Sequence, residues 1–246
     1  TPVGPVVVNA LDESGCEGTR TYTWTYVDCE GNRHQWKYVY TIERHVPVTG
    51  RLIWKGNALN NPMNTIGVGQ AYVNMAGASM GSFLTSGTPP PTGDFTLDAT
   101  SCGGHTLTPE KNINWLNGVT SADATAIQQH LTGFAPILDP YRLIAADVNK
   151  SYSISSADAS TIRQALLGNP SALNVFKLTK SWRFVPTDYP VIPPTKFTLP
   201  VFPETRSFTV DDVTIGISGQ DFYGVKVGDV KEEGIPGGTA NPANKP

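Results

Sequence analysis

The chain has 246 residues, of which 16% are charged, and its formal net charge is −3. This length fits two or three small domains, and the small negative charge gives no reason to expect a nucleic acid or an anionic membrane as partner. No apolar run approaches the ~20 residues of a membrane-spanning helix, so we expect no direct membrane insertion. Frequent Gly (24) and Pro (20) favour β modules joined by turns over a helical enzyme. The first residues read as a strand region, and we expect a processed or partial product of a longer protein.

Residues 19–43 predict a β-hairpin with a turn at 28–32, because aromatic and β-branched residues alternate on both sides of that turn. Thr21, Thr23 and Thr25 are expected to form the wetter face. One hairpin is too small to be stable alone, so either residues 2–10 add a strand or another domain covers the aromatic face. Core packing is the commoner explanation for such a stripe, and a glycan-binding platform is the alternative. The alternating aromatic and apolar positions are Tyr22, Trp24, Tyr26, Trp36, Tyr38, Tyr40 and Ile42.

Three cysteines are present. Cys16 and Cys29 flank a strand, and such a pair in an exported β module predicts a disulfide. Cys102 lies in a Ser-Cys-Gly-Gly turn, where it is either a small buried hydrophobe or a partner in a bond between chains. We favour the first, because the sequence places no His or Asp near it that would make it a nucleophile.

Short apolar runs with Gly-, Asn- and Pro-rich turns predict a second small β-sandwich over residues 47–110. Apolar spacings of three and four then predict amphipathic helices at 121–131 and 156–167. Ser121 and either Ser155 or Ser156 are candidate N-caps, and Gly133 and Gly168 follow the helix ends. Strand signals return between 181 and 230.

The two helical segments belong to an internal repeat that predicts calcium binding. Calcium takes six to eight oxygen ligands, and a short loop can supply them at alternate positions with an acid at position 12. In the second copy the predicted ligands are Asp147, Asn149, Ser151, Ser153, Ser155 and Asp158. In the first, weaker copy they are Asn112, Asn114, Leu116, Gly118, Thr120 and Asp123. The alternative is a calcium-free loop in which Asp147 and Asp158 act as turn and helix-cap residues.

This repeat resembles the dockerin type I family, whose unit is an EF-hand-like calcium loop followed by one helix. The resemblance covers residues 111–169 and implies calcium as cofactor. It departs from the family at position 6, where Tyr152 replaces the usual Gly, and at position 5, where Ser151 replaces Asp or Asn.

Two further resemblances concern the flanks. Residues 16–42, from Cys-Glu-Gly-Thr-Arg to Tyr-Thr-Ile, resemble the C-terminal half of a hyalin repeat, an immunoglobulin-like module. The blocks at 141–149, 181–185 and 221–230 resemble the dockerin-containing ends of large secreted proteins of gliding-type Gram-negative bacteria. There a carboxypeptidase-regulatory-like β-sandwich precedes the dockerin, which implies such a sandwich over 50–108. Together these resemblances imply export and display on a Gram-negative cell surface.

Enzyme signatures are missing from the sequence. The histidines at 34, 45, 105 and 130 show no metal-binding spacing, and neither a GxSxG elbow nor a phosphate loop occurs. We therefore expect a non-enzyme.

The expected fold is mainly β, with tandem immunoglobulin-like β-sandwiches and a small α-helical dockerin-like calcium-binding domain. The expected domains are 1–46 (partial hyalin repeat), 47–110 (sandwich), 111–170 (dockerin-like pair), 171–233 (C-terminal β segment packed on the preceding domains) and 234–246 (extended tail).

The expected function is that of a calcium-stabilised extracellular structural or adhesive protein, and a filament subunit is its sharper form. Its partners would be other copies of itself or adjacent domains of the parent protein, with 1–10 or 234–246 as candidate donor strands. The alternatives are a docking module for a cohesin-like partner and a glycan-binding adhesin.

Overall fold

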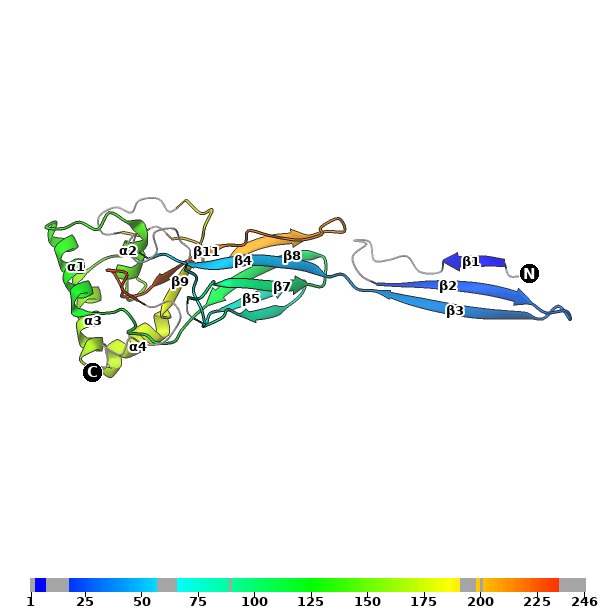
Figure 1. The fold of residues 1–246 in the computed structure, drawn as a ribbon, viewed down its shortest axis with the longest axis horizontal. Helices are drawn as coiled ribbons and strands as arrows, with labels where there is room; N and C mark the ends of the chain where they lie inside the picture. Colours follow the sequence, from blue (N-terminus) through cyan, green and yellow to red (C-terminus); the bar gives the residue numbers. More distant parts are fainter. Residues whose placement is uncertain are drawn as a thin grey trace.

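The computed structural model describes residues 3–7, 18–56, 66–88, 90–190, 198–199 and 201–234. These residues form several β-sheets and four short helices, which confirms the mainly β prediction. Figure 1 shows three parts in a row: a narrow three-stranded sheet, two larger sheets, and the helices at the opposite end.

The narrow sheet contains the predicted hairpin. Strands β2 (Gly18–Val27) and β3 (Arg33–Ile42) pair in antiparallel register, with Trp24 opposite Trp36. Asp28 closes the turn, because its carboxylate accepts hydrogen bonds from the backbone N–H groups of Glu30 (2.9 Å) and Asn32 (2.8 Å). Strand β1 (Val3–Val7) pairs with the other edge of β2, so the N-terminal residues do add a strand, as one of our two alternatives required.

The expectation for the two faces of this sheet is wrong. Thr23, predicted on the wetter face, is only 9% exposed, whereas Trp36 on the aromatic face is 51% exposed. Thr23 lies at the centre of the sheet, between β1 and β3. Larger neighbouring side chains can shield a short side chain there, while the large rings on the opposite face are left uncovered.

Two four-stranded sheets form the middle of the molecule. One has the order β10-β8-β5-β6 and the other β7-β4-β11-β9. Alternate residues of β7 point inward, which gives the strict period of two of a half-buried strand. The strands are β4 (Val46–Trp54), β5 (Tyr72–Gly77), β6 (Gly81–Leu84), β7 (Asp94–Ala99), β8 (Gly103–Glu110), β9 (Trp182–Pro186), β10 (Arg206–Val210) and β11 (Phe222–Lys226).

Strands from the C-terminal third complete both of these sheets. β10 pairs with β8, while β11 lies between β4 and β9, parallel to the first and antiparallel to the second. Strands from all these segments share one hydrophobic core, in which Leu52, Phe95, Trp182 and Phe222 are buried together. The C-terminal β segment is thus hydrogen-bonded into the sheets that residues 47–110 begin. The division into domains and the immunoglobulin-like character of the sheets stay predictions.

Four helices form the far end of the molecule: α1 (Ser121–Thr132), α2 (Pro140–Ala146), α3 (Ser156–Leu166) and α4 (Pro170–Thr179). α1 and α3 are the two predicted helices. Ser155 caps α3 as expected, but Thr120 rather than Ser121 caps α1. α2 and α4 were not predicted, and each begins with a capping Asp or Asn followed by Pro.

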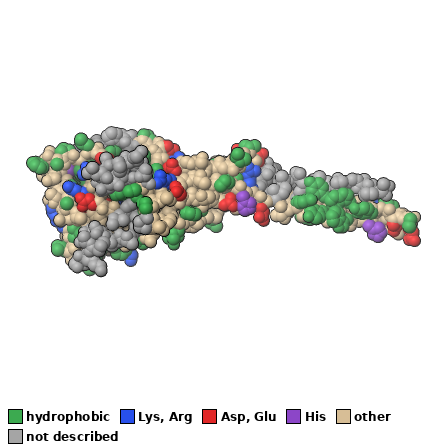
Figure 2. Space-filling model, viewed as in Figure 1, with side chains coloured by type: hydrophobic (Ala, Val, Ile, Leu, Met, Phe, Trp, Pro, Cys, Tyr) green, Lys and Arg blue, Asp and Glu red, His purple; other side chains and the backbone are tan. Residues whose placement is uncertain are grey.

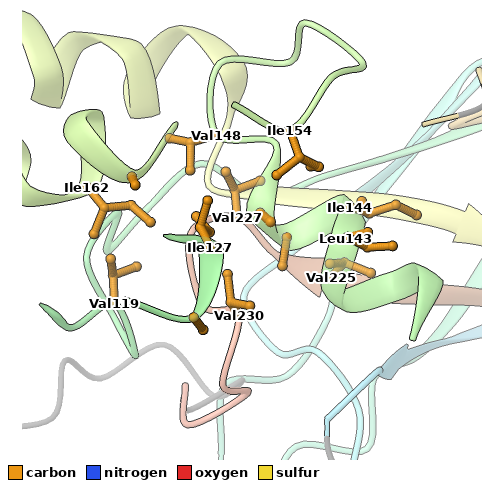
Figure 3. Close-up of a cluster of buried hydrophobic side chains, with 14 of the residues drawn as sticks. Val119, Ile127, Leu143, Ile144, Val148, Ile154, Ile162, Val225, Val227 and Val230 are labelled. Atoms are coloured by element: carbon orange, nitrogen blue, oxygen red, sulfur yellow. The ribbon is translucent and has the colours of Figure 1, made fainter. Parts of the chain in front are cut away.

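The helices pack on the outer face of β9 and β11. Their core joins Ile127 of α1, Ile144 of α2 and Ile162 of α3 to Val225 and its neighbours from the C-terminal strands (Figure 3). Hydrophobic burial therefore holds the helices against the same strands that complete the sheets. Within the described ranges, no helix is both long and apolar enough to span a bilayer.

A substitution at Gly67 tests how closely the loops of the two large sheets approach each other. A Cβ added at Gly67 would lie 2.0 Å from the carbonyl oxygen of Thr92. We expect Gly67→Ala to lower the melting temperature by about 5 °C, because backbone must move to relieve the overlap. Gly104→Ala is the matched control, since a Cβ there meets no atom within 4 Å. Equal melting temperatures for the two variants in differential scanning calorimetry would contradict this close approach.

Candidate functional site

The most exposed apolar surface of the narrow sheet is its aromatic face, and we call it the aromatic ladder. The ladder consists of Tyr22, Trp24, Trp36, Tyr38 and Tyr40. Neighbouring rings touch along it, with centroids 4.8 Å apart for Trp24 and Trp36 and 4.5 Å apart for Tyr38 and Tyr40. These contacts hold the rings in one continuous surface (Figure 2).

The described part of the chain leaves the β3 rings of the ladder uncovered, whereas Tyr22 and Trp24 on β2 are half-buried. Trp36 and Tyr40 are each about half exposed, at 51% and 50%. Strand β3 is an edge of its sheet, since the order is β1-β2-β3. An apolar face beside an edge strand is a surface to which another protein can add, either by packing or by strand pairing.

The second predicted calcium loop folds around its two acids. The Asp147 carboxylate accepts hydrogen bonds from the backbone N–H groups of Ser151 and Tyr152, both at 2.9 Å. Tyr152 has φ of +59°, so the position that is usually Gly keeps the left-handed backbone of a tight loop. Asn149 accepts from the N–H of Ser151 at 3.0 Å, and the Ser151 hydroxyl lies 3.0 Å from that of Ser153.

Asp158 closes this loop and starts its helix. One carboxylate oxygen accepts from the N–H of Ser155 at 2.9 Å, and the other accepts from the N–H of Val148 at 3.1 Å. The Ser155 side chain in turn accepts a hydrogen bond from a backbone N–H in the first turn of the helix, so Ser155 and Asp158 form a capping box. Burial raises the pKa of Asp158 despite these hydrogen bonds.

The first predicted loop repeats part of this arrangement. Asp123 accepts from the N–H of Thr120 at 2.7 Å in a capping box, and its other oxygen accepts from the N–H of Lys231 at 2.8 Å. Burial raises the pKa of Asp123 as well. Asn112 does not face Asp123 but binds the C-terminal end of α4, where its amide donates to the carbonyl of Lys177. Asn114 and Gly118 have a left-handed backbone conformation, so the backbone path of this loop differs from that of the second loop.

The predicted calcium ligands fit a divalent cation poorly at Asp147. The buried guanidinium of Arg183 lies beside it, with Nη1 3.8 Å from Asp147 Oδ2. A calcium ion bound to this carboxylate would face a fixed positive charge with little water to screen it. Among the described residues, no three His, Cys, Asp or Glu side chains gather as a metal-binding group. Calcium at either loop stays a prediction.

Sequence reasoning missed Arg183 and Lys226, two buried cations beside the loops; Lys111, just before the first loop, is a third. Arg183 and Lys226 are each a single charge inside an apolar strand, within Trp-Arg-Phe-Val and Val-Lys-Val. Such a charge is almost never fully buried without a partner, so the pattern indicates a partner although it does not identify one.

A buried Ser79–His105 pair is the nearest arrangement to a nucleophile and base. The Ser79 hydroxyl lies 2.8 Å from Nε2 of His105, and Nδ1 lies 3.1 Å from the carbonyl of Gly103. His105 also stacks on Phe208. A carbonyl in place of a carboxylate, together with the burial of both side chains, fits a structural hydrogen bond between β8 and the turn after β5.

The predicted Cys16–Cys29 disulfide is wrong in the structure, because Cys29 is an exposed free thiol at the hairpin turn. Cys16 itself lies outside the described residues. Cys102, which we expected to be a small buried hydrophobe, packs half-buried against the core of the two large sheets and is disulfide-bonded. The spacing of cysteines along the sequence does not establish which of them pair.

A family model described as an HYR-like domain with 4 cysteines matches residues 1–42. This match agrees with the hyalin-repeat resemblance, covers the strands that carry the aromatic ladder, and suggests an extracellular surface or adhesion-type module. No curated protein and no solved structure matches the chain. The dockerin-type and carboxypeptidase-regulatory-like resemblances stay predictions.

The free thiol gives a direct test of the hairpin tip. We expect iodoacetamide to alkylate Cys29 in the native, unreduced protein, because its free thiol is exposed to the reagent. Peptide mass spectrometry would locate the label, with the same chain first denatured without reductant as control. A native chain that resists the reagent at Cys29, with a Cys16–Cys29 peptide in the non-reduced digest, would contradict the structure.

Proposed function

We propose that the chain is a non-enzymatic structural or adhesive module on the surface of a Gram-negative bacterium, and that it binds a second copy of itself through the aromatic ladder. The observation that carries the proposal is the half-exposed ladder on a sheet that projects from the rest of the molecule (Figures 1 and 2). The HYR-like match over the same residues supports the extracellular, adhesion-type setting.

The chemistry of the ladder favours a protein partner. Tyr and Trp are enriched at the centres of protein interfaces, since their large rings bury much area with little loss of side-chain entropy. Charged residues of β3 lie on the other face, because Arg33 and Lys37 alternate with Trp36 and Tyr38 along the strand. The β3 side of the ladder is therefore an apolar surface with little charge to desolvate.

A second copy is the partner that fits this surface. A three-stranded sheet with one uncovered apolar face gains stability when another sheet packs against it. Two copies related by a two-fold axis would present identical ladders to each other, and such an interface closes without further partners. If the β3 edge of one copy paired with the β1 edge of the next in place of the ladder, the contacts would continue into a filament. Neither arrangement requires calcium.

Glycan binding is the second candidate, and one feature favours it. Tyr26, His34, Gln35 and Trp36 line a shallow open hollow beside the hairpin tip. An aromatic ring next to His and Gln side chains can stack on a sugar and hydrogen-bond its hydroxyls. The observations on the docking alternative are divided: Thr125 and Gln164 on the outer positions of the helices are polar and exposed, whereas Leu167 and Leu178 near the helix ends are exposed and apolar.

Paired substitutions on the two faces of β3 test the proposal. We expect the wild-type chain to self-associate with rising concentration in sedimentation velocity, and Trp36→Thr/Tyr38→Thr to weaken that association at least about 30-fold, because aromatic residues dominate such interfaces. Gln35→Thr/Lys37→Thr changes the opposite face of the same strand and should associate as the wild type does.

A wild-type chain that remains monomeric over the whole concentration range would overturn self-association. If such a monomer changed its tryptophan fluorescence on titration with glycans, the glycan-binding candidate would replace it.

A further inference from the structure

The second loop is built around the guanidinium of Arg183. This side chain leaves β9 between Trp182 and Phe184, on the face toward the helices, and it is 1% exposed. Nη1 lies 3.8 Å from Asp147, while Nε and Nη2 lie 3.2 and 3.0 Å from Oε1 of Glu204. The guanidinium also lies over the ring of Tyr152, 5.3 Å from its centroid. Arg183 thus touches the first and sixth positions of the predicted calcium loop.

The charges around Arg183 complement one another. Asp147 and Glu204 are the acids in contact with it, and Lys150 makes a second ion pair with Glu204 at 2.8 Å. A buried carboxylate is costly unless a positive charge and hydrogen bonds compensate its lost hydration. Calcium provides that compensation in an EF-hand-like loop, and a guanidinium held by the protein provides it at Asp147.

The first loop has a protein cation of its own. Lys226, at the end of β11, is buried and donates from Nζ to the carbonyl oxygens of Trp115 (2.6 Å) and Val227 (2.9 Å). Trp115 is the fourth residue of that loop, and backbone carbonyls are among the ligands that a calcium loop offers to its ion. Burial lowers the pKa of Lys226 to about 7; the nearby Lys111 adds to that shift, and the carboxylates of Asp229 and Asp123 oppose it.

Both cations come from one place in the sheet. β9 and β11 are hydrogen-bonded neighbours, with Arg183 opposite Val225 and Trp182 opposite Lys226. The two side chains therefore leave neighbouring positions on opposite faces of the strand pair. Arg183 shares the face of Val225 and contacts the second loop, whereas Lys226 shares the face of Trp182 and reaches Trp115 of the first loop. The arrangement uses a different residue type for each loop: Arg183 lies beside Asp147 of the second loop, and Lys226 contacts the first loop, beside which Lys111 is also buried.

We propose that the two calcium-like loops are held by internal cations, Arg183 in the loop 147–158 and Lys226 in the loop 112–123, and that they fold without bound calcium. This explains why positions that usually carry charged ligands have become Ser151 and Leu116. A loop that is neutralised by a side chain of the sheet needs fewer acidic ligands. The same side chain also fixes the helices to β9 and β11.

The first experiment compares thermal unfolding of the full wild-type chain in millimolar calcium and in excess chelator. We expect the same melting temperature in both, and no heat of calcium binding in isothermal titration calorimetry. A melting temperature that rises with calcium, as mass action requires for an ion that binds the folded state, would overturn the proposal.

The second experiment tests the charge of Arg183. Arg183→Gln should lower the melting temperature by about 10 °C, because it leaves the carboxylate of Asp147 buried without its cation. Adding Asp147→Asn should restore part of the loss, since it removes that charge. Arg163→Gln, in a side chain that contacts Gln128 at the surface, is the control and should leave the melting temperature unchanged.

A double variant that is no more stable than Arg183→Gln alone would show that Arg183 does not neutralise Asp147. If Arg183→Gln fails to fold, the calcium comparison on the wild-type chain still decides the proposal. Neither experiment depends on the aromatic ladder, so its outcome leaves the proposed function untouched.

Discussion

The strand pair β9 and β11 is covered on both faces, and the described architecture depends on that double burial. Trp182 and Phe222 point into the core shared by the two large sheets, whereas Val185 and Val225 point into the core beneath the helices. Burying both faces removes a large apolar area from water and leaves little room for sliding between the parts. Because Arg183 lies between Trp182 and Phe184, the same alternation that builds the sheet also delivers a charge to the helical side.

The two ends of the molecule differ in whether their side chains find partners within the described chain. At the helical end, capping boxes and internal ion pairs provide partners for Asp123, Asp147 and Asp158. At the hairpin end, the aromatic ladder has contacts within itself but no described cover. Under the proposed function, the uncovered hairpin end would be the contact surface and the helical end the stable body.

Local patterns predicted the hairpin and the helices α1 and α3, because their periodicities of two and 3.6 follow from one buried face each. Thr120 was missed as the cap of α1, although the Thr-x-x-Asp spacing with Asp123 identifies it. Helix α2, with seven residues, is too short for a clear periodicity; the pairs Asp139-Pro140 and Asn169-Pro170 mark the starts of α2 and α4. The assembly of β9, β10 and β11 into both sheets depends on contacts between segments far apart in sequence, so no local signal predicts it. For the same reason the sequence predicts calcium at Asp147: no local signal places the distant Arg183 beside it.

In the proposed function, the aromatic ladder is a surface that another copy covers. Hydrogen–deuterium exchange followed at several protein concentrations tests it most directly, because association protects the contacted strands and leaves the core unaffected. If another copy covers the ladder, exchange in β3 slows as the protein concentration rises, whereas exchange in β9 and β11 stays slow and constant. Exchange in β3 that is fast and identical at every concentration would contradict it.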